Sequence, residues 1–439
     1  MIVDLYLFAI AGALFGVLVG MLPGLSNSVA MIMAFPILML TGPLNAVAFY
    51  IALITVSSYT GSVSATLLGV AGEAGSMPAL KEGLALNVRG VANLALGSAA
   101  VGSFIGSTIG VALSMIIYWI GAKYYALYSF SFQLAMLVAV VLITFFGTNR
   151  GNRVVTFFLI IAGFLLGRIG FNAITNDHFL TLGNVYLMQG IPLIPVMIFL
   201  YSIPILVNLD RQAMRQSCER NSKIVWRIEI PWITTVRASV VGFFCGFTPI
   251  LSNIMSSNVA YSIEKFLLGA NYRRDGDVRA LVASESANNA GNIGCLIPLL
   301  AFGIPIVASE AVLFEITNTK GLIYSLDWVL QNFHWIVGTF IVANLIGFLF
   351  SWPLASILSR IVSLFSNYFK WVIMILLVLI CFWAGWREAQ AMYYVILIAI
   401  FLPIGLLLRK FDLLPLVIMF MLSPLIENNS IIVWNLYAR

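Results

Sequence analysis

Two adjacent amides, Asn288 and Asn289, stand at the start of an apolar stretch in the second half of the chain. Residues 284–305 read SESANNAGNIGCLIPLLAFGIP, so several glycines and two prolines follow the amides. Proline removes a helix donor and frees a carbonyl, and glycine lets the backbone turn. The pattern predicts a hairpin whose tip exposes peptide groups. Gly303 and Pro305 end this run, and they join the two amides as candidate binding residues.

A hairpin tip of this kind could bind ions. Exposed amides at the N-terminus of a half-helix attract carboxylates, whereas unwound carbonyls bind a cation such as sodium. Asn288 and Asn289 could supply both kinds of dipole without burying a charge. The alternative role is structural, because polar side chains in membranes also hydrogen-bond neighbouring helices.

Small and hydroxyl-bearing residues form a similar stretch in the first half, at residues 59–73. We expect this stretch to form a partner hairpin, with Gly61 and Ser62 at its tip. Ser62, Ser64 and Thr66 alternate along the chain, so they cannot all share one face of a helix. The alternative for each hydroxyl is a hydrogen bond back to its own helix.

A short motif occurs twice along the chain. GMLPGLSN at residues 20–27 returns as GFTPILSN at residues 246–253, and both 246 minus 20 and 253 minus 27 give an offset of 226. Corresponding interruptions of apolar segments in two halves are the best sequence indicator of a transporter's substrate site. A residue after such a break can also cap the next helix, beside free amides that attract anions. Each copy ends in a Ser-Asn pair, which adds four candidates: Ser26, Asn27, Ser252 and Asn253.

Acidic residues within or beside apolar stretches are candidates for a proton or cation site, because intramembrane acids mark ion pathways. Glu285 lies closest along the chain to the two amides. The alternative is an interfacial position at the edge of an apolar segment. The acidic candidates are Glu73, Glu285, Glu310 and Glu315. The candidate ligands for a sodium ion are Asn27, Ser62, Asn253 and Asn289.

The composition places these residues in a membrane protein. Of 439 residues, 61% are hydrophobic and only 9% are charged, and the mean hydropathy is +1.02. Soluble proteins carry about 25% charged residues. At about 20 residues for each crossing, the chain could hold on the order of ten to thirteen spanning or re-entrant elements. We therefore expect an all-α polytopic, multi-pass protein in contact with the lipid bilayer.

A polar linker divides the chain into two halves. Residues 208–237 carry six basic and three acidic side chains, which predicts that this linker is cytoplasmic. We expect a first transmembrane repeat at 1–207, the basic linker at 208–237 and a second repeat at 238–439. If the repeats are inverted, both termini lie on the opposite, periplasmic side. The linker carries half of the net charge of +6, so the charge does not indicate a nucleic-acid partner.

Signatures of catalysis and of metal or disulfide frameworks are absent from the sequence. The two histidines are 156 residues apart (334 minus 178), and the four cysteines form no C-x-x-C pair. The sequence contains neither an H-E-x-x-H motif nor a P-loop. We therefore expect no enzyme and no cofactor other than a coupling ion.

The repeated motif and the run from ANNA to GIP resemble the large membrane subunit of tripartite tricarboxylate transporters, the TctA family. In the first half the resemblance rests on G-x-x-P-G-L at residues 20–25, on the small residues at 59–72 and, more loosely, on 82–90. In the second half it rests on Glu264-Lys265 and on residues 285–305. The resemblance covers the chain from about Gly12 to Glu315.

The resemblance implies a secondary transporter that imports a small organic anion, with sodium or a proton as the coupling ion. It implies two inverted structural repeats with re-entrant hairpins and broken helices, and an elevator-type transport domain that moves against a scaffold. It also implies a small four-helix membrane subunit and a periplasmic substrate-binding protein as partners. The expected location is the bacterial inner (plasma) membrane.

We therefore expect the large membrane (permease) subunit of a binding-protein-dependent secondary transporter that imports a carboxylate. The alternative is a non-transporting assembly or receptor-docking membrane subunit. A membrane-embedded enzyme is a further alternative, and it would need a polar catalytic set that the sequence lacks.

Overall fold

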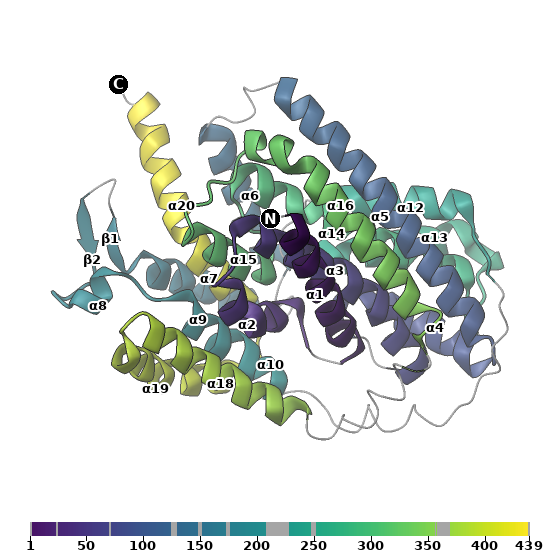
Figure 1. Cartoon of the computed structure of the whole chain (residues 1–439), viewed down its shortest axis with the longest axis horizontal. Coiled ribbons are helices and arrows are strands. Elements are labelled where there is room, and N and C mark those ends of the chain that lie inside the picture. Colours follow the sequence, from purple (N-terminus) through teal and green to yellow (C-terminus); the bar gives the residue numbers. More distant parts are fainter. Residues whose placement is uncertain are drawn as a thin grey trace.

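The chain folds as a predominantly helical molecule, seen in the computed structural model of Figure 1. The structure describes residues 2–22, 25–69, 72–123, 130–147, 152–172, 176–207, 228–246, 252–355, 357 and 369–437. Within these ranges, six helices are long and apolar enough to cross a membrane, and five shorter apolar helices accompany them. The predicted helical membrane protein is therefore confirmed. One short hairpin, β1 (Gly170–Asn172) with β2 (Asp177–Phe179), departs from the expected all-α fold.

The first half of the chain forms the helices up to α10, with π-helical and 3-10 turns between them. In chain order they are α1 (Ile2–Met21), α2 (Asn27–Leu38), α3 (Pro43–Val63), the π-helix η1 (Ser64–Leu68), the 3-10 turn η2 (Ala74–Ser76), α4 (Met77–Val88), α5 (Ala92–Lys123), α6 (Phe130–Gly147), α7 (Arg153–Arg168), α8 (Val185–Met188), α9 (Leu193–Pro195), the π-helix η4 (Val196–Ser202) and α10 (Ile203–Val207).

The second half begins with a helix that starts inside the predicted linker. In chain order its elements are α12 (Trp232–Gly246), α13 (Ser252–Leu268), the 3-10 turn η5 (Gly269–Asn271), α14 (Val278–Phe302), α15 (Ala308–Asn318), α16 (Leu326–Ser351), α18 (Phe369–Arg387), α19 (Ala391–Leu408) and α20 (Leu414–Tyr437). Residues 208–227, which hold most of the predicted basic linker, lie outside the described residues.

The helices form two groups that lie side by side (Figure 1). On one side are α1, α3, α4, α5, α12, α13, α14 and α16, and on the other are α2, α6, α7, α9, α10, α15 and α18 to α20. The hairpin of β1 and β2, together with α8, projects from the outer edge of the second group.

Two helices, α3 and α14, lie in the interior of the molecule. The apolar window of α3 is 100% buried, whereas those of α16 and α19 are 33% and 28% buried. In α14, every residue from 280 to 301 is buried. Both interior helices nevertheless carry many polar side chains, which a helix surrounded by apolar neighbours tolerates only when those groups find partners. The polar interior of the protein is therefore built on α3 and α14.

Glycines let these interior helices approach their neighbours closely. A Cβ on Gly12 of α1 would collide with the backbone of Phe49 in α3, and one on Gly242 of α12 would collide with the backbone of Ala287 in α14. Further along, Gly20 and Gly246 make the same kind of approach to the same two helices. The glycines spaced by four residues therefore mark helix contacts, as small residues do in membrane proteins.

The two halves of the chain are joined by a buried acid of the first half, Glu82, in α4. Its Oε1 accepts hydrogen bonds from the hydroxyls of Tyr261 and Tyr272, both at 2.6 Å, and its Oε2 accepts one from the backbone N–H of Asp277 at 2.9 Å. The Lys265 ammonium lies 4.6 Å from the centre of the Tyr272 ring. Three partners on the second half thus hold one carboxylate of the first.

We expect Glu82→Gln to destabilise the protein by about 1.5–3 kcal/mol, because it removes charge-assisted hydrogen bonds from a buried site. Thermal unfolding of the purified protein in detergent measures this loss. The matched control is Asp275→Asn, since Asp275 is largely exposed and pairs only with Arg89 at 3.4 Å. A midpoint for Glu82→Gln equal to that of the control would show that this contact does not hold the halves together.

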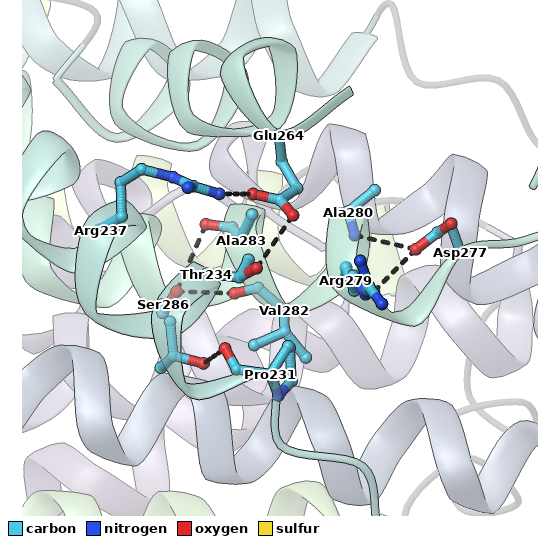
Figure 2. A network of polar contacts seen from close by, with 11 residues as sticks. Pro231, Thr234, Arg237, Glu264, Asp277, Arg279, Ala280, Val282, Ala283 and Ser286 are labelled. Atoms are coloured by element: carbon cyan, nitrogen blue, oxygen red, sulfur yellow. Dashed lines mark hydrogen bonds and ion pairs between the residues drawn. The ribbon is translucent and has the colours of Figure 1, made fainter. Parts of the chain in front are cut away.

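A second polar contact links α12 to α13 (Figure 2). Arg237 forms an ion pair with Glu264, and the Thr234 hydroxyl donates to the other carboxylate oxygen at 2.9 Å. Arg237 therefore belongs to a helix of the second half, although the sequence placed it in the linker.

Candidate functional site

One face of α14 carries the polar side chains of the interior. Glu285, Asn288, Asn289 and Asn292 follow the spacing i, i+3, i+4 and i+7, which puts them on one side of a helix. None of the four side chains is more than 2% exposed. A helix face with this much buried polarity is rare in membranes and marks functional positions.

Hydrogen bonds connect this face to the first half of the chain. The Asn288 amide donates from Nδ2 to Glu73 Oε1 at 2.7 Å, and Asn292 Nδ2 donates to the Ser58 hydroxyl of α3 at 2.5 Å. One residue earlier in α3, the Ser57 hydroxyl donates to Asn27 Oδ1 at 2.8 Å. Polar groups of α2, α3, α14 and the Glu73 segment therefore form one cluster, which we call the α3–α14 polar cluster.

Glycines bring the Glu73 segment against α3 and α14. A Cβ on Gly61 would lie 2.7 Å from Ser76 Oγ and 3.1 Å from Glu73 Cγ, so only glycine leaves room there. A Cβ on Gly75 would overlap the amide of Asn288. Gly61 thus serves packing of the segment that carries Glu73.

Several buried acceptor oxygens of the cluster lack a donor among the described residues. Glu285 is completely buried, and neither of its carboxylate oxygens has a hydrogen-bond partner. Ser62 lies beside this carboxylate, but its hydroxyl donates to the backbone oxygen of Tyr59 at 2.7 Å. Three further oxygens of the cluster also lack a donor: Glu73 Oε2, Asn288 Oδ1 and Asn289 Oδ1. A proton, a cation or a hydrogen-bond donor of a ligand would satisfy such acceptor oxygens.

The prediction that these residues lie at hairpin tips is wrong. Asn288 and Asn289 lie in the middle of the continuous helix α14, and Gly61 and Ser62 lie within α3. Proline 298 does not break α14, since a membrane helix can absorb a proline when neighbours satisfy the freed groups. The breaks fall later, at Gly69 and Gly303, where φ is 66° and 68°.

The predicted site residues separate into groups. Asn27, Gly61, Ser62, Asn288 and Asn289 surround the α3–α14 polar cluster, although the Asn289 amide donates to the Glu285 carbonyl of its own helix at 3.1 Å. The structure therefore brings one part of the predicted set together.

The remaining predicted residues lie elsewhere or have a structural role. The Ser26 hydroxyl accepts from the Val29 N–H at 3.3 Å and caps α2. Gly303 and Pro305 lie past the end of α14, about 22 Å along the helix from Asn288 at 1.5 Å per residue. Ser252 and Asn253 begin α13, but their side chains are outside the described residues.

Two of the acids considered from the sequence have other tasks. Glu310 Oε2 accepts from the N–H of Ile306 at 2.8 Å and so caps the start of α15. Glu315 lines a cavity of about 610 Å³ between α7, α15 and α20, together with Arg168, Glu388 and Glu427. The arginine of this cavity pairs with Glu427 at 3.0 Å.

Sequence reasoning missed how Glu73 and Glu285 come together, and it missed Ser57, Ser58 and Asn292. The spacing of Glu285, Asn288, Asn289 and Asn292 was a readable signal, since it fits one helix face. The contact between positions 73 and 288 was not readable, because the two residues are 215 positions apart. Among the residues that the structure describes, no group of three or more His, Cys, Asp or Glu could hold a metal ion.

A membrane-embedded bundle with a buried polar cluster on its interior helices belongs to the class of polytopic transport proteins, in which intramembrane polar groups mark the path of a solute. Comparison with known proteins agrees with this class. The sequence pattern of the tripartite tricarboxylate transporter TctA family matches residues 6–420, and the chain belongs to this family. It is a transporter family, so the chain is not an enzyme.

A curated relative covers the chain almost completely. It is an uncharacterized 52.8 kDa protein in the TAR-I ttuC′ 3′ region of Agrobacterium vitis, 24% identical over 441 residues, which span 95% of this chain and 84% of the relative. No solved structure matches the chain significantly.

Proposed function

We propose that the chain is the large membrane subunit that carries an organic anion, specifically a carboxylate, across the bacterial inner membrane as a secondary transporter. Membership of the family supports a membrane component of a tripartite tricarboxylate transporter. The observation that carries the proposal is the α3–α14 polar cluster, in which buried amides of the second half hydrogen-bond Glu73 and Ser58 of the first half.

The substrate would bind beside the amide groups of the cluster. Asn288 and Asn289 can donate hydrogen bonds to a carboxylate without an arginine, and a weak site of this kind allows release on the other side of the membrane. We place Asn27, Gly61 and Ser62 in the same site, since they border the cluster. Ser252 and Asn253, at the start of α13, remain predicted members.

Alternating access would follow from an internal repeat. Gly16 approaches Leu53, and its counterpart at the offset of 226, Gly242, approaches Ala287, so α1 packs on α3 as α12 packs on α14. This correspondence supports the two inverted repeats proposed for the fold, with an elevator-like movement of one helix group against the other. The broken helices at Gly69 and Gly303 would provide the flexible ends that such a movement needs.

Partner subunits complete the proposal. The family name implies further components, and we propose a periplasmic substrate-binding protein and a small four-helix membrane subunit. A gradient of sodium ions or protons would drive uptake. The competing function is an assembly or receptor-docking subunit that carries no substrate itself.

Uptake measurements with reconstituted protein test this function. The chain, with the subunits that co-purify with it, is placed in sealed vesicles and supplied with labelled mono-, di- and tricarboxylates, with and without its binding protein. We expect at least one carboxylate to enter only when the binding protein is present. Entry of none of them under any imposed gradient would favour the assembly subunit and contradict the proposal.

A further inference from the structure

We propose that Glu73 and Glu285 together hold one proton, which crosses the membrane with the substrate and couples uptake to the proton gradient. The inference rests on the proposed transport function and names its coupling ion and the residues that carry it. Glu73, on the segment after α3, is hydrogen-bonded to Asn288, and Glu285 lies on the same face of α14 three residues before Asn288, so both carboxylates belong to the α3–α14 polar cluster.

The geometry around Glu285 calls for a proton. Its side chain is fully buried, and neither oxygen accepts a hydrogen bond from any of the residues that the structure describes. An ionised carboxylate in such a place lacks both solvent and donor, and a second carboxylate beside it adds like-charge repulsion. Two neighbouring carboxylates that share one proton avoid both penalties, because the protonated acid becomes a donor for the ionised one.

The structure gives the two acids different roles. Glu73 already accepts a hydrogen bond from the Asn288 amide at 2.7 Å, whereas Glu285 accepts none from the described residues. Glu73 is therefore the acid of the pair that better tolerates the negative charge. Glu285, which has no hydrogen-bond donor among the described residues, is the acid that carries the proton. Asn288 touches Glu73 directly, so substrate that engages this amide would alter how tightly the proton is held.

Positive side chains on the surrounding helices are engaged elsewhere. On α12, Arg237 pairs with Glu264 of α13. Lys81 of α4 and Lys265 of α13 lie over the ring of Tyr272, near Glu82. Arg89, at the end of α4, pairs with Asp275, and Arg279 lies at the start of α14. The remaining charged or histidine side chains on elements that pack against α14 or α3 are Asp4 of α1, Lys123 at the end of α5, Glu310 and Glu315 of α15, and Asp327 and His334 of α16. No ion pair in the described part of the chain joins any of them to Glu73 or Glu285.

A metal cation is a weaker explanation of the same oxygens. Cations such as calcium take six to eight oxygen ligands, usually with several carboxylates. The described residues bring only two acids together here, and they contain no group of three or more acidic, histidine or cysteine ligands. The sodium ligands predicted from the sequence are Asn27, Ser62, Asn253 and Asn289. Three of them, Asn27, Ser62 and Asn289, already hydrogen-bond within the protein. Sodium is therefore an outcome that the test must separate from the proton.

Substitution of each acid by its neutral amide tests the inference in two independent ways. The first readout is infrared difference spectroscopy of the purified protein, which detects the carbonyl stretch of a protonated carboxyl group and needs no substrate. The second is uptake of a labelled carboxylate into vesicles under a pH gradient alone or a sodium gradient alone, together with exchange of substrate between equal concentrations. The variants are Glu285→Gln, Glu73→Gln, the conservative Glu285→Asp, and the matched control Glu315→Gln.

We expect Glu285→Gln to remove one component of the protonated-carboxyl band, and we expect this component to remain in Glu315→Gln. Uptake driven by the pH gradient should fall to the level of protein-free vesicles in Glu285→Gln, whereas exchange should persist, because glutamine imitates the protonated acid. Glu285→Asp should recover part of the driven uptake. Glu73→Gln should slow driven uptake, since it removes the second carboxylate of the pair that shares the proton.

Other outcomes overturn the inference in recognisable ways. If Glu285→Gln keeps the same protonated-carboxyl band as the unaltered protein, or shows full proton-driven uptake, Glu285 has no part in the mechanism. Uptake by the unaltered protein that responds only to the sodium gradient would replace the proton by sodium. If the unaltered protein neither accumulates nor exchanges any carboxylate, the proposed function fails, and the infrared band alone then decides whether the acids share a proton.

Discussion

Replacing Asn288 and Asn289 together with alanine is expected to abolish uptake while the protein still inserts into the membrane. The double substitution removes the amide that donates to Glu73 and both unpartnered amide oxygens of the cluster. It leaves a buried carboxylate oxygen without its donor, at a cost of about 1–3 kcal/mol. Substrate would lose the donors that the proposal assigns to its carboxylate. Uptake of the labelled substrate at equal amounts of membrane protein measures the effect.

The matched control for the amide pair is Asn332→Ala. Like Asn289, Asn332 donates to the carbonyl four residues earlier in its own helix, Trp328 in this case, at 2.8 Å. It lies on α16, away from the polar cluster, so we expect its loss to leave uptake unchanged. Unchanged uptake in the Asn288 and Asn289 double variant would show that the substrate does not use these amides.

Adding a methyl group at Gly12 or Gly242 is expected to destabilise the protein, with a similar effect in the two halves. In each variant the new Cβ would collide with backbone of the interior helix, at Phe49 of α3 or Ala287 of α14. Backbone cannot move aside as a side chain can, so the helix pair must separate. Overpacking of this kind costs about 1–3 kcal/mol. The temperature of unfolding in detergent measures the loss.

The control for these two glycines is Gly338→Ala in the middle of α16. Its new Cβ would meet the hydroxyl end of the Tyr6 side chain at 2.5 Å, and a flexible side chain can move. We expect a smaller drop in the unfolding temperature than for Gly12→Ala or Gly242→Ala. Equal drops for all three variants would show that the α1–α3 and α12–α14 contacts are no tighter than other contacts between helices.

The sequence was sufficient for the class of fold, because 61% hydrophobic and 9% charged residues leave few alternatives to a membrane bundle. It also identified Asn27, Ser62 and Asn288 as unusual, since polar residues inside apolar stretches need a reason. It could not show that Asn288 meets Glu73, because a periodic pattern reports one helix and says nothing of which helix faces it.

The errors have a common physical cause. Glycine and proline were read as signs of hairpin tips, but Gly61 and Gly75 serve close packing, and Pro298 is absorbed inside α14. Both residue types have more than one use in membrane helices. The sequence presents each acid separately, and only the fold shows that Glu73 and Glu285 belong to one cluster. The family match then places this cluster in a transporter.

Accumulation of a carboxylate against its own concentration gradient is the most direct measurement of the central claim. Sealed vesicles that contain the chain and its co-purifying subunits are given binding protein, labelled carboxylate and an imposed ion gradient. We predict an internal concentration above the external one, which collapses when an ionophore dissipates the gradient and which is absent in the Asn288 and Asn289 double variant. An internal concentration that never exceeds the external one, with or without the gradient, would contradict the account.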